Sequence, residues 1–179
     1  MKKPILVVLL FFVFIFLGNF LKVNSASTIS LGNQKVIYTL PYPGMWPDHP
    51  LFFIKTIRDN VQEFLTRDLL KKADFYLLLS DKYISMADQL TRKGKHQLAV
   101  STAEKAEKYA QNITPIITSS KKQGSLATDD FIRKIQNSNI KHREMIEGMM
   151  KELPQGSLES ITQVLEINKE VGQKVGLTE

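Results

Sequence analysis

The chain has 179 residues, of which 43% are hydrophobic and 23% charged, as expected for one folded domain rather than a disordered polar segment. Residues 1–26 contain three of the 24 basic residues and no acidic residue. Residues 27–179 therefore contain 21 basic and 18 acidic residues, and their formal net charge is +3, compared with +6 for the whole chain. These basic residues are interspersed with acids, which argues against a nucleic-acid-binding surface. The absence of cysteine excludes disulfides, thiol catalysis, thiolate zinc sites and iron–sulfur clusters.

Residues 1–26 have the layout of a signal peptide or a membrane anchor. Lys2 and Lys3 precede an unbroken apolar run from Pro4 to Leu17. With the apolar residues up to Leu21, the segment nearly reaches the length of a transmembrane helix, so both a cleaved signal and an uncleaved anchor remain open. In either case the basic flank predicts that the rest of the chain lies outside the cytoplasm, secreted or anchored in the membrane.

Residues 27–49 are predicted to be a linker that ends in a proline-rich strap (residues 40–50). Residues 35–40 suit a short extended segment, and the four prolines of the strap forbid helix. Tyr42, Met45 and Trp46 could form a platform that binds a peptide or sugar partner. We favour a rigid strap whose three side chains pack onto the bundle, because aromatic rings act mainly by burying area.

Residues 50–179 are predicted to be a helical bundle domain. We expect Asp48 to cap its first helix, with Pro50 in the first turn. Apolar residues then recur at helical spacing: Leu51, Phe52, Ile54, Ile57, Val61 and Leu65.

A heptad pattern typical of coiled coils begins at Asp68. Its first row is Leu69, Tyr76, Tyr83 and Leu90, and its second is Ala73, Ser80 and Ala87. Gly94 suits a tight turn, after which the pattern resumes with small residues, so we expect an antiparallel hairpin. Pro115 is expected to kink the second helix or to end its regular part.

A second hairpin is predicted after a connector at residues 119–128. Thr128 with Asp129 and Asp130 makes a good helix start, and we expect a break at residues 154–156, with Ser157 capping the last helix. The predicted fold class is therefore all-α. It consists of two antiparallel helical hairpins in an elongated bundle, preceded by the strap and an N-terminal hydrophobic helix.

His142 is the one polar residue that stands out, because it lies on an apolar row of the predicted helix. It could be a metal ligand or a pH-sensing group. We favour a buried histidine with a structural hydrogen bond, because a zinc site needs three or four ligands and no second histidine lies nearby. Folding the second hairpin places position 142 opposite position 169, so the expected partner is Asn168 or a residue of another helix.

Several motifs resemble one prokaryotic family. Leu40–Gly44 (LPYPG) and Pro47–Leu51 (PDHPL) are the most specific of them, and the resemblance continues through the hairpins to about residue 175. On these motifs the chain resembles the family called domain of unknown function 5667. The resemblance implies a helical domain that follows a signal or a single membrane segment, and it implies no activity.

The function that we expect is non-enzymatic. The chain has no glycine-rich phosphate loop, HExxH motif, nucleophile elbow or EF-hand loop, so we predict no catalytic, cofactor-binding or metal-binding residues. The predicted role is a binding or interaction protein of the cell envelope. Its partner would be an envelope protein, together with the membrane if the N-terminal segment is uncleaved. The alternative is an extracytoplasmic stress or metal sensor of the helical-hairpin type.

Overall fold

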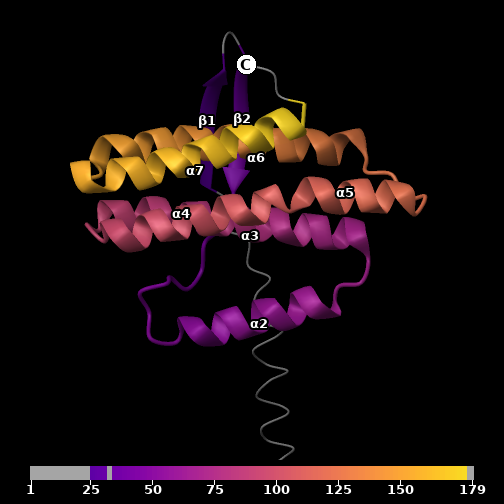
Figure 1. The fold of residues 1–179 in the computed structure, drawn as a ribbon, viewed down its shortest axis with the longest axis horizontal. Coiled ribbons are helices and arrows are strands. Elements are labelled where there is room, and N and C mark those ends of the chain that lie inside the picture. The colour runs from indigo at the N-terminus through magenta and orange to yellow at the C-terminus, as the bar shows by residue number, and fades with distance from the viewer. Residues whose placement is uncertain (1–24, 32–33, 177–179) are drawn as a thin grey trace, which may run out of the picture.

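The computed structural model describes residues 25–31 and 34–176. The fold is all-α apart from one small β-hairpin (Figure 1). The strands are β1 (Ser25–Leu31) and β2 (Gln34–Leu40), and the helices are α2 (Phe52–Leu65), α3 (Leu69–Arg92), α4 (His96–Gln111), α5 (Ile113–Lys122), α6 (Asp129–Glu152) and α7 (Gln155–Lys174). The predicted N-terminal hydrophobic helix lies outside the described residues. Within the described ranges, no helix has the length and hydropathy needed to cross a bilayer.

Helices α3 and α4 form the first hairpin. The Asp68 carboxylate accepts a hydrogen bond from the Lys71 backbone N–H and so caps α3. Gly94 has a φ of 72°, a left-handed conformation that side chains disfavour, which explains why glycine occupies this turn. Helix α4 ends at Gln111, and α5 then packs beside α3 with Pro115 in its first turn, where a missing N–H costs nothing.

Helices α6 and α7 form the second hairpin. The Thr128 hydroxyl accepts from the Phe131 N–H, and Asp129 and Asp130 occupy the first turn of α6, as expected. The predicted break at 154–156 is displaced. Pro154, with ψ of 155°, is the N-cap residue, so α7 begins at Gln155, and Gly156 and Ser157 lie inside the helix. The connector is also shorter than predicted, because α5 extends to Lys122.

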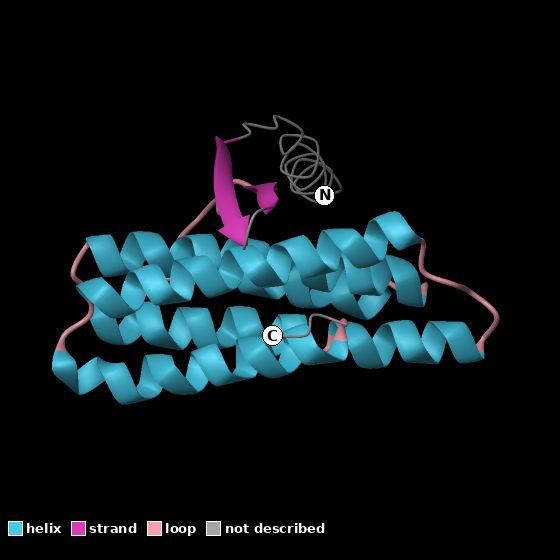
Figure 2. Cartoon of the chain, turned by 90° about the horizontal axis from the view of Figure 1, so that it is seen from above, coloured by secondary structure: helices cyan, strands magenta, loops and turns pink. Residues whose placement is uncertain are grey.

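The four long helices close into an elongated bundle. Around its axis α3 packs against α4, α4 against α7, α7 against α6, and α6 against α3. The helices lie in layers, with the β-hairpin on one side (Figure 2). Strand β2 packs across α3 and α6. The core is built from the apolar rows predicted in α3 to α7, and not from that of residues 51–65. Its largest fully buried apolar side chains are Leu77, Tyr83, Ile84, Met86, Leu90, Ile113, Ile135, Ile146, Met149 and Ile161.

Strands β1 and β2 pair antiparallel, with Ser25 opposite Leu40 and Leu31 opposite Gln34. The segment expected to be extended, residues 35–40, is therefore part of β2. In Figure 1 the tip of the hairpin points away from α2, and its open end, with Ser25 and Leu40, lies toward the bundle. The strap leads from this open end to α2.

Candidate functional site

A cluster of buried polar side chains crosses the centre of the bundle. His142 on α6 has no solvent exposure. Its Nδ1 lies 2.7 Å from Oε1 of Glu107 on α4, and its Nε2 lies 3.1 Å from Oδ1 of Asp81 on α3. Tyr38 of β2 donates a hydrogen bond of 2.6 Å to Oδ2 of Asp81, and Ser138 donates one of 2.5 Å to Oδ1. The cluster therefore joins three helices and the β-hairpin.

Asn168 links the fourth helix to this cluster. Its Nδ2 donates to Oε2 of Glu107 at 3.2 Å, and to the Asn139 carbonyl at 3.1 Å, while Asn139 donates to the Asn168 carbonyl at 2.9 Å. Gly172 permits this close packing of α7 on α6, because a Cβ at this position would lie 2.8 Å from Oδ1 of Asn139. His142 and Asn168 thus share Glu107 as a partner. Of the two predicted arrangements, His142 is held by other helices, α3 and α4, and no direct bond to Asn168 is formed among the described contacts.

The two carboxylates determine the charge of His142. Burial lowers the pKa of an imidazole, but the charge of Glu107 and the hydrogen bonds with Asp81 and Glu107 outweigh burial and raise the pKa of His142 to about 9. The ring is therefore an imidazolium at neutral pH, and both of its nitrogens donate. An imidazolium has no lone pair for a metal ion. Among the residues that the structure describes, no group of three or more candidate side chains is placed to hold a metal ion.

This cluster is closed to solvent, since His142, Glu107 and Asn168 are all fully buried. No substrate could reach its ionisable atoms without opening the bundle. Its chemistry is that of an internal salt bridge between one cation and two anions. Burial of Tyr38 raises the pKa of its hydroxyl, and the nearby Asp81 carboxylate raises it further.

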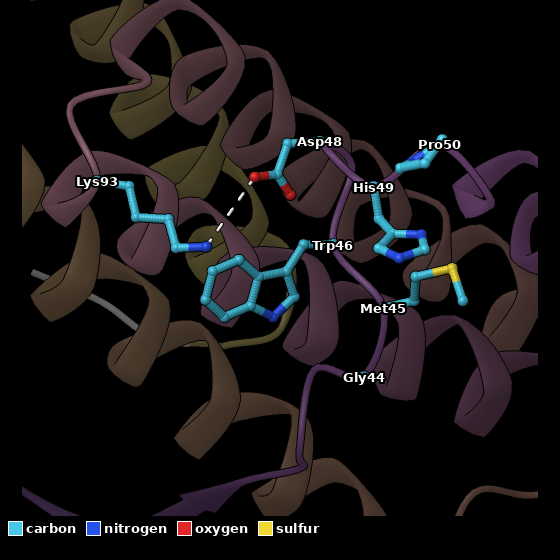
Figure 3. A pocket seen from close by; sticks show the side chains of 7 residues that line it. All are labelled: Gly44, Met45, Trp46, Asp48, His49, Pro50 and Lys93. Atoms are coloured by element: carbon cyan, nitrogen blue, oxygen red, sulfur yellow. Dashed lines mark ion pairs between the residues drawn. The ribbon is translucent and has the colours of Figure 1, made fainter.

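The three side chains of the strap that were singled out in the sequence lie in different surroundings. Trp46 is half-buried against the core, and Nζ of Lys93 lies 3.5 Å from the centroid of its ring (Figure 3). Tyr42 is 67% exposed, so the prediction that it packs onto the bundle is wrong. Met45 is 38% exposed and lines a surface hollow together with Trp46 and His49.

The role expected for Asp48 is also wrong. Asp48 does not cap α2, whose N-cap residue is Leu51 and has no side-chain cap bond. Instead, its carboxylate lies 2.7 Å from Nζ of Lys95 and 4.0 Å from Nζ of Lys93, so it fastens the strap to the α3–α4 turn. The Leu51 N–H is taken up by Nδ1 of His49 at 3.1 Å.

The first strap residues border a groove of 580 Å³. Leu40 to Pro43 form one wall, and α3 and α6 form the other. The helix side chains in this wall include Asp88, Arg92, Lys141, Glu144, Met145 and Glu152. Lys141 is buried and pairs with Glu144 at 2.9 Å. The exposed ring of Tyr42 stands beside this mixed polar and apolar surface.

Helix α2 has its apolar face toward solvent. Its outer side and the residue before it carry seven large exposed apolar side chains: Leu51, Phe53, Ile54, Ile57, Val61, Phe64 and Leu65. Phe64 is 83% exposed, the highest value among the large hydrophobic side chains of the described residues. We call these seven residues the outer face of α2. The helical spacing in the sequence predicted this helix, but nothing in that spacing indicated that its apolar side faces away from the bundle.

The inner side of α2 is polar and charged. Nζ of Lys55 lies 2.6 Å from Oδ2 of Asp59, and Nη2 of Arg58 lies 2.8 Å from Oδ1. Lys55 and Asp59 are both buried, and Lys55 also stands over the ring of Tyr83 on α3, 4.8 Å from its centroid. Glu63 accepts a hydrogen bond from the hydroxyl of Tyr76. The contacts of α2 with the bundle are therefore made by these polar side chains and by Phe52, whose ring packs edge-on against Tyr83.

Comparison with known proteins supplies one match. A family model described as Domain of unknown function (DUF5667) covers residues 44–156, from the strap to the start of α7. No curated protein and no solved structure matches the chain. The match includes α2, both halves of the first hairpin, and all of α6 with His142. Because it spans more than half of the sequence, the chain belongs to the DUF5667 family.

Proposed function

We propose that this protein is a non-enzymatic binding module of the cell envelope, exported and either released or held by its N-terminal segment. The observation that carries the proposal is the outer face of α2. Seven large apolar side chains in one contiguous patch are unusual on a protein that acts alone, and such patches mark interaction surfaces. The buried charge cluster supports the absence of catalysis, because its ionisable groups are closed to solvent.

The strap offers a second candidate surface. Tyr42 and Met45 are exposed, and Tyr42 lies beside the 580 Å³ groove between the strap and helices α3 and α6. Tyrosine and methionine beside a groove with charged walls are typical of protein recognition sites. This surface would bind an envelope protein through an extended segment.

The proposal is tested by photo-crosslinking in intact cells. A photoreactive residue replaces Ile57 on the outer face of α2, Tyr42 on the strap, or Gln163 on the exposed side of α7 as the matched control. We expect adducts, to an envelope protein or to lipid, from position 57, or from positions 57 and 42, and none from position 163. A folded, exported protein that gives no adduct at position 57 or 42 would contradict the binding function.

Export is tested separately. A reporter fused after Glu179 is expected to be active only outside the cytoplasm, because Lys2 and Lys3 precede the apolar run. Cytoplasmic activity would contradict the localisation. The alternative role as a metal sensor is tested by adding zinc to the purified protein. A rise in melting temperature that His142→Gln abolishes would favour the sensor over the binding module.

A further inference from the structure

We propose that α2 lies flat on the extracytoplasmic surface of the membrane, with its outer face immersed at the boundary between headgroups and acyl chains. This inference rests on the proposed function and names the partner of the surface that carries it. The partner is a lipid bilayer with anionic headgroups. Three independent observations lead to it: the orientation of α2, the charge around it, and the length of chain that precedes the described residues.

The orientation of α2 is that of an interfacial helix. Its polar side is engaged by the bundle through Lys55, Asp59 and Glu63, while Ile54, Ile57, Val61 and Phe64 follow one another along the opposite side. In Figure 1 the helix lies apart from the bundle and parallel to it, at the edge of the molecule. A long apolar stripe of phenylalanine and isoleucine on a protruding helix matches a flat apolar layer.

The charge around α2 matches an anionic surface. Lys55, Arg58, Lys82 and Lys105 gather around Asp59. Burial lowers the pKa of Lys82 and of Lys105, and the nearby Lys55 lowers both further, which reflects this excess of cations. Neither Lys82 nor Lys105 forms an ion pair within the described part of the chain. Basic residues beside an apolar helix face are what anionic headgroups attract.

The same helix is followed by further exposed cations. Arg67 and Lys71 lie at the end of α2 and at the start of α3, and both are exposed. On α2 itself the two acidic residues are engaged on the inner side, Asp59 by Lys55 and Glu63 by Tyr76 and Lys72. At the end of α2 the exposed Asp68 lies between Arg67 and Lys71, so the exposed charges there sum to +1. Two copies of this face brought together would repel each other, so the charge favours a membrane over a second copy of the chain.

An N-terminal segment that stays in the bilayer would keep the bundle close to the membrane. Counted from Leu21, the end of that segment, the four residues from Lys22 to Ser25 span at most about 14 Å when fully extended. Ser25 pairs with Leu40 at the open end of the β-hairpin, and the tip of that hairpin points away from α2 (Figure 1). With the N-terminal segment inserted in the bilayer, the side of the molecule that bears α2 would therefore face the membrane.

The absence of cysteine makes a direct test possible. Ile57→Cys, Val61→Cys and the control Gln163→Cys are each labelled with a polarity-sensitive fluorophore in the full chain. Each protein is reconstituted into vesicles of phosphatidylcholine mixed with phosphatidylglycerol, or into pure phosphatidylcholine. All three positions are exposed, so labelling should leave the fold intact, which circular dichroism checks. The fluorophore reports only on the surroundings of its own position, so anchoring of the chain by the N-terminal segment does not by itself produce the signal.

We expect a blue shift and quenching by spin-labelled lipid at positions 57 and 61, stronger with phosphatidylglycerol and weaker at high salt, and only aqueous iodide quenching at position 163. Iodide quenching at positions 57 and 61 with no effect of spin-labelled lipid would overturn the inference. Shielding from both quenchers would overturn it as well, since another protein, a second copy or the N-terminal segment would then cover the face. Crosslinking from position 57 to a protein in cells would preserve the binding function even if the membrane assignment failed.

Discussion

The bundle interior and helix α2 differ in where their charged and apolar side chains lie. Inside the bundle, apolar rows face one another, and the one buried imidazolium, His142, lies between two carboxylates. At α2, buried Lys55 and Asp59 face the bundle, and the apolar side faces solvent. The bundle buries its apolar rows and pairs its central charges internally, whereas the outer face of α2 is left exposed. Amphipathic spacing therefore identifies a helix without showing which of its sides meets the rest of the protein.

The largest expected effect comes from removing the central cation. His142→Ala leaves Asp81 and Glu107 buried without a counter-charge, so we expect the free energy of unfolding to fall by about 3–5 kcal/mol. Denaturant unfolding of the two proteins measures this. His49→Ala is the matched control, because His49 is exposed and should cost no more than about 1 kcal/mol. A loss as small as that of the control would show that the charge cluster contributes little to the stability of the fold.

The double variant sharpens this prediction. Asn168 reaches the same Glu107 as His142, so the losses of His142→Ala and Asn168→Ala should not be additive. Additive losses would mean that Glu107 does not couple the two residues.

The second effect is a loss of stability at alkaline pH. The pKa of His142 is raised from an ordinary value of 6.5 to about 9, so the folded protein holds a proton that the unfolded chain releases. The stability from this proton is complete below pH 6.5 and is lost as the pH rises through about 9, by about 3 kcal/mol in total. Unfolding free energies across this range measure it. His142→Gln should lack this part of the pH dependence, and an equal slope in both proteins would assign it to other groups.

The smallest effect is expected on α2. Ile57→Ala removes an exposed side chain and should change the stability by less than about 0.5 kcal/mol, whereas Ile146→Ala removes a fully buried one and should cost about 2–5 kcal/mol. Thermal or denaturant unfolding compares the stabilities of the two variants, which carry the same substitution at an exposed and at a buried position. If Ile57→Ala destabilised the isolated protein as much as Ile146→Ala, the outer face of α2 would be part of the core.

Much of the fold could be predicted from the sequence. The rows that begin at Leu69 and Ala73 are core rows, Gly94 forms the predicted turn, and Thr128 caps α6. The helix boundaries at Pro154 and Lys122 were misplaced, because proline can itself stand at the N-cap and polar residues can extend a helix. The β-hairpin was foreseen only in its second strand, since register with β1 depends on the bundle beneath it.

The candidate site was harder to predict. His142 and Asn168 stood out as polar residues on apolar rows, but their shared partner Glu107 did not. A signal was present, since Glu107 follows Ala103 by four residues and precedes Ala110 by three, and Asp81 has the same relation to Leu77 and Ile84. Acidic residues at core spacing are easily assigned to a solvated surface. The direction of α2 could not be predicted, because its docking depends on contacts of its polar side with Tyr76 and Tyr83 on α3 that helical spacing alone does not reveal.

The attachment of the β-hairpin also has a mechanical consequence. Ser25 and Leu40 are paired at the open end of the hairpin. Tension on the chain before Ser25 would therefore break the strand pairs one after another from that end. Strand β2 would resist, because Tyr38 is fastened to Asp81 inside the bundle. Peeling of the seven residues of β1 would release about 25 Å of chain while the helices keep their packing. Unpairing of the hairpin would thus lengthen the connection between the N-terminal segment and the bundle when the chain is pulled.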